Sequence, residues 1–319
     1  MIDFRNMDCM ELLATLPDKS QHLIIVDPPY FEVKGKFDFV WESFDAYLAD
    51  VEKWAKEIKR VMVDNGTLFW WGHAKKIAYS QVILDKYFNL ENHLKWEKKE
   101  CQTMAQDFEQ SRTYAPITEH LLMYSNEIGM TGLEFIEKEY IAPRNPFALE
   151  LKRARIEKGV SINQVAEYGK FYGNVNHGGA VTNWERGYNV PLASQWKILC
   201  DNLPIRRKEY EELRKEYEEL RRPFNNYMKL TDVLKFSQEA HITGKIAHPT
   251  QKPPKLCSAL IRTCSKKGQN LLVPFGGSGV EIIEGYHWGL NVTASELCPE
   301  YYALAQERIK RETAQLSFL

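Results

Sequence analysis

Short apolar runs alternate with helical patterns at both ends of this 319-residue chain, and this alternation most constrains the fold. A run of four to eight apolar residues predicts a buried strand, whereas apolar residues recurring every three or four positions predict a helix. We expect strands at 22–26, 67–71, 90–96, 117–124, 269–275 and 290–296, and helices at 44–63, 280–288 and 299–312. Asn65-Gly66 predicts the turn after the first of these helices. Such alternation favours an α/β fold with a mostly parallel sheet.

The pattern changes near residue 145, where prolines and an asparagine interrupt it and short helical segments separated by glycine follow. Residues 151–200 hold seven Lys and Arg against three Glu, although the whole chain, with 42 basic and 43 acidic residues, has a net charge of −1. A local basic segment within a neutral chain leaves binding to a polyanion open. We therefore expect an α/β domain formed by 1–144 and 226–319, interrupted by an inserted helical domain at 145–225.

The sequence KEYEELR occurs twice in succession at 208–221. It places Tyr210, Leu213, Tyr217 and Leu220 at alternating spacings of three and four, which is typical of an amphipathic helix of two heptads. We expect this helix to pack on its own chain. A contact between two copies of the chain, giving a homodimer, is the alternative.

The six cysteines are scattered, with no CxxC pair and no histidines at metal-binding spacing. This usage is typical of free thiols in a reducing compartment and predicts no metal site. The N-terminus is charged where a signal peptide would be apolar, and no apolar run reaches the length of a membrane span. We therefore expect a cytoplasmic protein that does not enter a membrane.

The motif Asp27-Pro28-Pro29-Tyr30 follows one of the expected strands. Ligands bind at the carboxyl ends of strands in open α/β sheets, so its carboxylate is placed for binding. The two prolines lack N–H donors, so the turn presents acceptors, which suit an exocyclic amine, and an aromatic ring that can stack on a flat heterocycle. A strand-ending turn with a surface tyrosine is the alternative.

A glycine-rich loop, Phe275-Gly276-Gly277-Ser278-Gly279, lies between an expected strand and an expected helix. Glycines there allow the backbone to approach a ligand closely, and Glu296, which ends the next strand, can accept two ribose hydroxyls. These residues predict a cofactor that contains a nucleoside, without choosing among NAD, ATP and S-adenosylmethionine. The missing GK[ST] sequence argues against a phosphate-binding P-loop.

A third motif, His248-Pro249-Thr250-Gln251-Lys252-Pro253, precedes that strand. It is a stiff turn that presents a hydroxyl, an amide and an ammonium group, and Lys252 suits a charge-assisted contact with a cofactor carboxylate. By itself this motif equally suits a surface loop.

Taken together and in this order, the three motifs resemble the beta class of amino-group DNA methyltransferases, which use S-adenosylmethionine. The resemblance covers about 1–140 and 230–315. It implies a Rossmann-like, seven-stranded, mostly parallel methyltransferase sheet, and double-stranded DNA as the partner. DPPY in place of SPPY points to N6 of adenine rather than N4 of cytosine, and the chain has no Pro-Cys nucleophile for C5 methylation.

The same likeness implies residue roles. Asp27 and the Pro28 carbonyl accept hydrogen bonds from the target amine, and Tyr30 stacks on the flipped base. The cofactor-binding residues it implies are Asp8, Cys9, Asp27, His248, Thr250, Lys252, Phe275, Gly276, Gly277, Ser278, Gly279 and Glu296. The family usually has an aspartate where this chain has Val273, which removes a polar contact near the cofactor.

Within the insertion, residues 151–159, 161–166 and 181–187 resemble the helix-turn-helix of the lambda-repressor and Cro type. Ser161 is suited to cap the second helix, although residues 167–179 are longer and richer in glycine than that family's turn. The prediction is a DNA-reading domain, with a purely structural insertion as the alternative. The residues expected to contact DNA are Lys152, Arg153, Arg155, His177, Thr182 and Asn183.

The resulting hypothesis is a site-specific DNA adenine-N6 methyltransferase whose insertion recognises the target, with a cognate restriction nuclease as a further partner. One alternative is a DNA-binding regulator with a degenerate methyltransferase body, for which Val273 together with the repressor-like helices is the argument. Another is N4-cytosine or RNA amine methylation, because the DPPY chemistry serves any flat aromatic amine.

Overall fold

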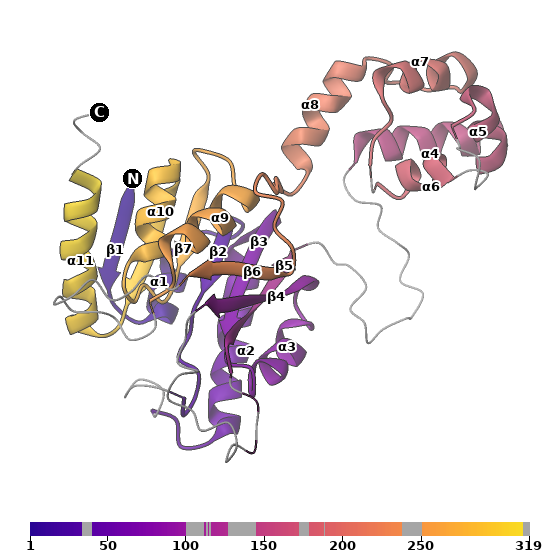
Figure 1. The fold of residues 1–319 in the computed structure, drawn as a ribbon. Helices are drawn as coiled ribbons and strands as arrows, with labels where there is room; N and C mark the ends of the chain where they lie inside the picture. Colours follow the sequence, from indigo (N-terminus) through magenta and orange to yellow (C-terminus); the bar gives the residue numbers. More distant parts are fainter. Residues whose placement is uncertain are drawn as a thin grey trace. The chain divides into compact units, whose positions relative to one another are not determined.

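The computed structural model describes residues 1–33, 40–99, 112, 114, 116–126, 145–171, 179–187, 189–237 and 251–314. The chain forms two compact units, one made of Met1–Glu134 with Arg222–Leu319 and the other of Phe135–Arg221. The first is an α/β unit and the second is helical (Figure 1). No helix in the described ranges is long and apolar enough to cross a membrane.

A single sheet organises the α/β unit, with the strand order β1-β8-β7-β2-β3-β5-β4-β6. Its strands are β1 (Ile2–Asn6), β2 (Gln21–Val26), β3 (Met62–Gly72), β4 (Asn89–Lys99), β5 (Thr118–Ser125), β6 (Val233–Ser237), β7 (Asn270–Val273) and β8 (Asn291–Glu296). All neighbours pair in parallel except β5, which is antiparallel to β3 and β4. Within the described residues the sheet has eight strands rather than the expected seven, because β6 adds to the outer edge of β4.

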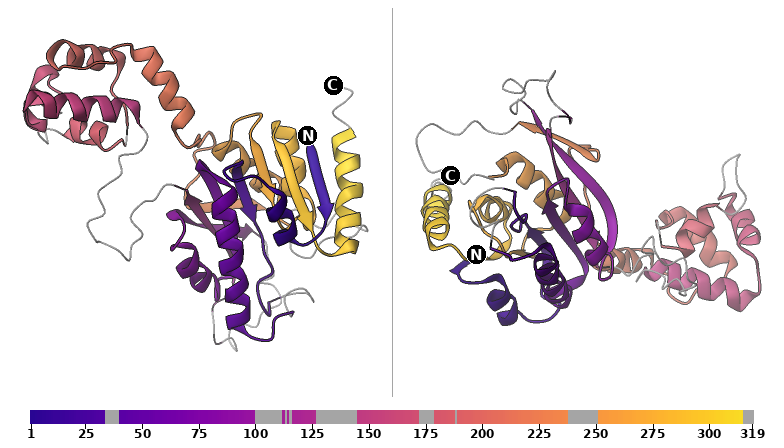
Figure 2. Two further views of the ribbon diagram at one scale, coloured as in Figure 1. Left: turned by 180° about the vertical axis from the view of Figure 1, so that it is seen from behind. Right: turned by 90° about the horizontal axis from the view of Figure 1, so that it is seen from below.

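Helices cover both faces of this sheet (Figures 1 and 2). One face carries α1 (Cys9–Thr15), α2 (Phe44–Val61) and α3 (Ile77–Leu84), and the other α9 (Pro254–Cys264), α10 (Val280–Trp288) and α11 (Pro299–Ala314). Strand β2 contributes Leu23 and Ile25 to one apolar cluster and Ile24 and Val26 to the other. A strand buried on both faces reads as a continuous apolar run, which is why the sequence pattern there was clear.

The expected turn at Asn65-Gly66 is wrong. Helix α2 ends at Val61 and β3 begins directly at Met62, so both residues lie inside the strand. A Cβ on Gly66 would stand 2.8 Å from Cγ of Met62. The glycine therefore makes room for a neighbouring side chain within the strand, which is a known use of glycine in sheets.

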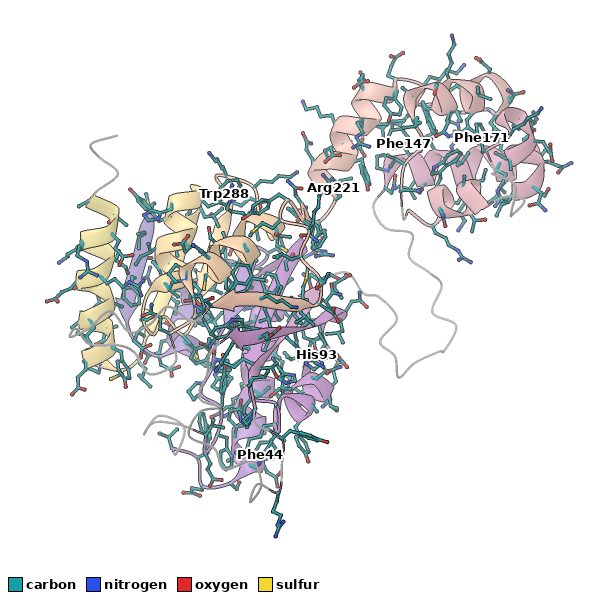
Figure 3. The ribbon with its side chains drawn as sticks, viewed as in Figure 1. Phe44, His93, Phe147, Phe171, Arg221 and Trp288 are labelled. Carbon is teal, nitrogen blue, oxygen red and sulfur yellow. The ribbon has the colours of Figure 1, made fainter. Side chains whose placement is uncertain are left out.

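The helical unit consists of α4 (Pro146–Lys158), α5 (Ile162–Gly169), α6 (Gly179–Glu185), α7 (Ala193–Asn202) and α8 (Tyr210–Leu220). Asn145 caps α4, which ends at Gly159 in the left-handed conformation with a φ of 70°. Ser161 caps α5 in a capping box with Gln164, which confirms the predicted N-cap. Phe147 and Phe171 belong to the core that these helices enclose (Figure 3).

The repeated KEYEELR sequence forms α8, which packs on its own chain as expected. Leu213 is fully buried in the helical core, and Tyr210 and Tyr217 pack against that core. Tyr210 also donates a hydrogen bond to the Pro191 carbonyl. The first heptad thus uses its apolar stripe within the unit, and the homodimer stays a prediction.

Candidate active site

The motifs converge because of the sheet topology. Strands β1, β8, β7, β2 and β3 are parallel, so their carboxyl ends share one edge. The antiparallel β5 begins at that same edge, with His120 opposite Gly72 at the end of β3. Asp27 follows β2, Glu296 ends β8, and Glu119 is the second residue of β5. This edge is where open α/β sheets bind ligands.

Two donors hold the Asp27 carboxylate. The Tyr30 hydroxyl donates to Oδ1 at 2.5 Å, and the Lys252 ammonium donates to Oδ2 at 2.6 Å. The Asp27 side chain is 22% exposed, whereas that of Lys252 is 1% exposed. Pro28 is buried beside it. The DPPY motif is therefore a fixed acceptor group rather than a loose surface turn.

Lys252 also faces a second carboxylate, which the sequence did not point to. Its Nζ lies 3.4 Å from Oε2 of Glu119 and 4.8 Å from the centre of the Trp71 ring, while Lys98 pairs with the other Glu119 oxygen. Burial opposes charge on Lys252, yet Asp27 and Glu119 raise its pKa overall. Burial likewise opposes charge on Glu119, and the ammonium groups of Lys252 and Lys98 lower its pKa. Basic and acidic side chains thus alternate along a row formed by Lys98, Glu119, Lys252 and Asp27.

The backbone after DPPY is strained. Phe31 and Glu32 have φ values of 39° and 51°, in a region that side chains other than glycine rarely adopt. Phe31 is held there by ring contact with Phe44 at 5.4 Å and by Lys76, which donates to its carbonyl oxygen. Such conformations persist where the surroundings enforce them, and they cluster at functional sites.

The glycine loop is folded tightly against β8. The Gly276 N–H donates to the Ser295 carbonyl at 2.6 Å, and a Cβ on Gly276 would stand 2.7 Å from the Phe4 ring. Gly277 and Gly279 have φ values of 48° and 76°, which favour glycine. The close packing of the loop on β8 therefore requires glycine at Gly276, which is buried, whereas Gly277 and Ser278 are half-buried.

Glu296 faces this loop. One carboxylate oxygen accepts the Gly277 N–H at 2.8 Å and the other accepts the Cys298 N–H at 2.9 Å. Burial raises the pKa of Glu296 in spite of these hydrogen bonds. Each oxygen retains a lone pair, so the carboxylate can still accept a hydroxyl. A glycine cradle beside an oriented carboxylate fits the nucleoside-containing cofactor that the sequence predicts.

Asp8 and Cys9 lie at the adjacent strand end. Strand β1 pairs with β8 so that Asn6 stands opposite Glu296. Asp8 then caps α1 by accepting the Met10 N–H at 2.8 Å. The Cys9 side chain is buried in an apolar cluster, where burial raises its pKa. Of these two residues, Asp8, with its half-buried carboxylate, is thus the one available to a polar ligand.

Three predicted site residues, His177, His248 and Thr250, lie outside the described residues. Val273, which stands where the resembled family usually has an aspartate, is 1% exposed within an apolar cluster. Valine suits these surroundings, and the glycine loop and Glu296 are in place next to it.

Sequence reasoning missed Glu119, Lys98, Trp71 and Glu281. Glu281, in the first turn of α10, is 6% exposed and accepts a hydrogen bond from the Cys257 thiol at 3.4 Å. Burial, followed by repulsion from Asp27, raises its pKa. The available signal was an acidic residue within an otherwise apolar strand or helix, since a buried carboxylate needs a partner or a function. No group of His, Cys, Asp and Glu in the described residues could hold a metal ion.

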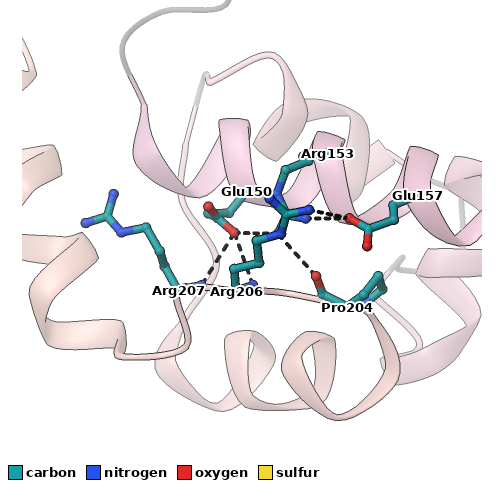
Figure 4. A network of polar contacts seen from close by, with 6 residues as sticks. All are labelled: Glu150, Arg153, Glu157, Pro204, Arg206 and Arg207. Atoms are coloured by element: carbon teal, nitrogen blue, oxygen red, sulfur yellow. Dashed lines mark hydrogen bonds and ion pairs between the residues drawn. The ribbon is translucent and has the colours of Figure 1, made fainter.

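The residues expected to contact DNA divide into two sets. Lys152 and Asn183 are exposed, and Thr182 on α6 is half-buried. Arg155, by contrast, pairs bidentately with Glu185, at 2.5 and 3.0 Å. Arg153 donates to Glu150, Glu157 and the Pro204 carbonyl (Figure 4). Carboxylates of the same unit thus neutralise both arginines, which the count of basic residues did not reveal.

Fold and site together define an α/β protein whose glycine loop and oriented carboxylate suit a nucleoside-containing cofactor, beside a motif rich in hydrogen-bond acceptors. The model of the N6/N4 DNA methylase family matches residues 21–307, and the chain belongs to that family. Members use S-adenosylmethionine, and this protein is an S-adenosylmethionine-dependent DNA methyltransferase.

Relatives and solved structures agree with this assignment. The chain is 25% identical over 312 residues to the type II methyltransferase M.HpaI of Haemophilus parainfluenzae, covering 96% of this chain and 73% of that protein. It is 22% identical over 305 residues to M1.MboII of Moraxella bovis, covering 92% and 91%. The fold is similar to that of the M1.HpyAVI–SAM complex, with a TM-score of 0.53, 16% identity and coverage of 97% and 100%. It is also similar to that of the cytosine-N4-specific PvuII DNA methyltransferase, with a TM-score of 0.55 and 13% identity. That match covers 98% of this chain and 90% of the PvuII chain.

Proposed function

We propose that the protein transfers a methyl group from S-adenosylmethionine to N6 of an adenine flipped out of duplex DNA, at sites selected by its helical unit. The observation that carries this proposal is the Asp27 carboxylate, fixed by Tyr30 and Lys252 at the sheet edge that also bears the glycine loop. An aspartate in DPPY favours adenine in the resembled class, and cytosine N4 is the competing substrate.

The chemistry requires acceptors more than a strong base. The lone pair of the adenine amine is delocalised into the ring, and hydrogen bonds from both its N–H groups favour the geometry in which that pair is localised on nitrogen. The Asp27 carboxylate and the Pro28 carbonyl supply these two acceptors. When bound, S-adenosylmethionine supplies the sulfonium-linked methyl group that the nitrogen attacks. The amine proton leaves after the transfer, so positioning and electrostatics provide most of the rate.

The cofactor is assigned to the glycine cradle. Backbone groups of Phe275, Gly276, Gly277, Ser278 and Gly279 would hold its methionine part, Glu296 its ribose and Asp8 its adenine. Support comes from the tight loop, which leaves no room for a Cβ on Gly276, and from the orientation of the Glu296 carboxylate by two backbone N–H groups. That this cradle forms beside Val273 favours an active enzyme over a degenerate body that only binds DNA.

Target recognition is assigned to the helical unit. Asn183 on α6 is exposed, and an asparagine can bind adenine bidentately in the major groove. Exposed Lys152 suits a phosphate contact. Because a base within a duplex cannot reach Asp27, flipping is required, at a cost of a few kcal/mol. Stacking on the Tyr30 ring would offset part of that cost.

Incubation with labelled S-adenosylmethionine and duplex DNA, followed by nucleoside mass spectrometry, tests the proposal. Label in N6-methyladenine is expected from the wild type and not from Asp27→Ala. Label in N4-methylcytosine would show that cytosine, and not adenine, is the substrate. Sequence-specific DNA binding without any methylation or cofactor affinity would instead show that the protein is a DNA-binding regulator with a degenerate methyltransferase body.

A further inference from the structure

We propose that Lys252 is a positioning residue of the methyl-transfer site. Anchored by Glu119, it holds the Asp27 carboxylate in the orientation in which it accepts the target amine. This inference rests on the proposed function and deepens it, because it gives the lysine of the third motif a partner other than the cofactor.

The first argument is the cost of burial. An ammonium group that is 1% exposed must be compensated by ionised or polar partners, because its desolvation costs several kcal/mol. Asp27 at 2.6 Å and Glu119 at 3.4 Å provide two negative charges, and the Trp71 ring at 4.8 Å offers its negative face. These contacts explain why a lysine is stable at this depth.

The second argument is that protein atoms surround the whole ammonium group. Lysine has three N–H donors and no acceptor. Besides the two carboxylates, the Tyr30 hydroxyl oxygen lies 3.4 Å from Nζ. The ammonium group thus donates hydrogen bonds to Asp27 and Tyr30 and forms an ion pair with Glu119. A contact with a cofactor carboxylate would compete with these partners, which the protein already provides.

The third argument concerns the geometry of Asp27. Lys252 donates to one oxygen and Tyr30 to the other. Tyr30 is three residues from Asp27 along the chain, whereas Lys252 is 225 residues away. The motif prolines have no N–H with which to compete. With a donor on each oxygen, the plane of the carboxylate is set, and each oxygen keeps a lone pair that can accept from an amine. Lys98 on the far side of Glu119 completes the alternating row of charges.

The decisive experiment compares Lys252→Met and Glu119→Gln with a matched control, Lys59→Met. Lys59 is a half-buried lysine that donates to Asn126, away from the site, so its loss tests for a general effect of removing such a group. For each variant, calorimetry gives the Kd of S-adenosylmethionine. Single-turnover methylation at saturating cofactor and DNA gives the rate, and circular dichroism gives the melting temperature.

A positioning role predicts a split between binding and rate. In Lys252→Met the rate should fall by about 10²- to 10³-fold, the magnitude typical of losing one preorganised charged donor. The cofactor Kd should stay within about threefold. Glu119→Gln should lower the rate by about tenfold, again without changing the Kd, and Lys59→Met should change neither.

The contrary results are equally definite. A cofactor Kd raised tenfold or more, with an unchanged rate at saturation, would assign Lys252 to the cofactor and overturn the proposal. Should Lys252→Met fail to fold, Glu119→Gln decides, and an unchanged rate in that variant refutes the role. Failure of the proposed function is separately visible, since wild-type protein would then label cytosine or no base. The cofactor Kd of Lys252→Met would still show whether Lys252 binds the cofactor.

Discussion

At the scale of single residues, the site depends on how one carboxylate is held. Asp27 would be an ordinary strand-end aspartate if Tyr30 and Lys252 did not each occupy one of its oxygens. The Tyr30 hydroxyl is buried, and burial together with the Asp27 charge raises its pKa. Tyr30 therefore stays a hydrogen-bond donor to Asp27 throughout the physiological range. Its ring, which is 9% exposed in an apolar cluster, has stacking on the flipped base as a second, proposed task.

These two tasks of Tyr30 are separable. Tyr30→Phe keeps the ring and removes the donor, and a hydrogen bond to a charged group contributes about 1.5–3 kcal/mol, so the single-turnover rate should fall by about 10- to 100-fold. Tyr30→Ala should lose more, because stacking goes as well. Tyr87→Phe, which removes a similar hydrogen bond to Glu52 elsewhere, is the control and should leave the rate unchanged. Equal rates for wild type and Tyr30→Phe would show that the hydroxyl has no role.

Glu281 makes stability depend on pH. Its pKa is raised above the ordinary value of 4.5 by burial and by Asp27, so the folded state prefers the protonated form. Stability is therefore lost as pH rises from the unfolded pKa to the folded pKa, and the loss is complete above the folded pKa. Glu281→Gln should therefore raise the melting temperature at neutral pH, and the gain should vanish as pH falls below 4.5. Melting curves over this range test the prediction against the exposed Glu307→Gln. A gain that persists in acid would contradict it.

At the scale of elements, the strand-to-helix loop after β7 is the proposed cofactor-binding element. Gly276→Ala would place a methyl group 2.7 Å from the Phe4 ring and 3.0 Å from the Ser295 carbonyl, so the loop must shift. We expect calorimetry to show a cofactor Kd raised by tenfold or more, since a shift of one ångström in a binding loop has effects of that order. Gly268→Ala, at a φ of 83° with open space around it, should cost about 1 kcal/mol of stability and leave the Kd unchanged.

Elements were predictable from sequence where local pattern and burial agree. The helix Val280–Trp288 has its predicted bounds, because the glycine before it and the glycine after it mark both ends. The end of α2 was misplaced because Asn65-Gly66 satisfies turn chemistry, while pairing of β3 with β2 and β5 decides otherwise. Strand β6 was missed since it exists only through its pairing with β4. Long-range pairing of this kind overrides local preference.

At the scale of the whole molecule, catalysis and recognition are assigned to separate units of the chain. If the assignment holds, Asn183→Ala should relax the choice of methylation site and leave the cofactor Kd unchanged. Sequencing of methylated positions in a host that expresses each variant provides the measurement. Asn189→Ala, another exposed asparagine of the same unit, is the matched control. An unaltered site pattern in Asn183→Ala would remove that residue from recognition.

The sequence by itself determined the sheet-and-helix architecture, the DPPY motif and the glycine cradle with Glu296, because each depends on residues that are close along the chain. Only the tertiary structure decided that Lys252 and Glu119 meet at Asp27, and that Arg153 and Arg155 are neutralised by glutamates. The physical reason is common to both. Charges in a folded protein act through distances in space, and a motif or a count of basic residues records only positions along the chain.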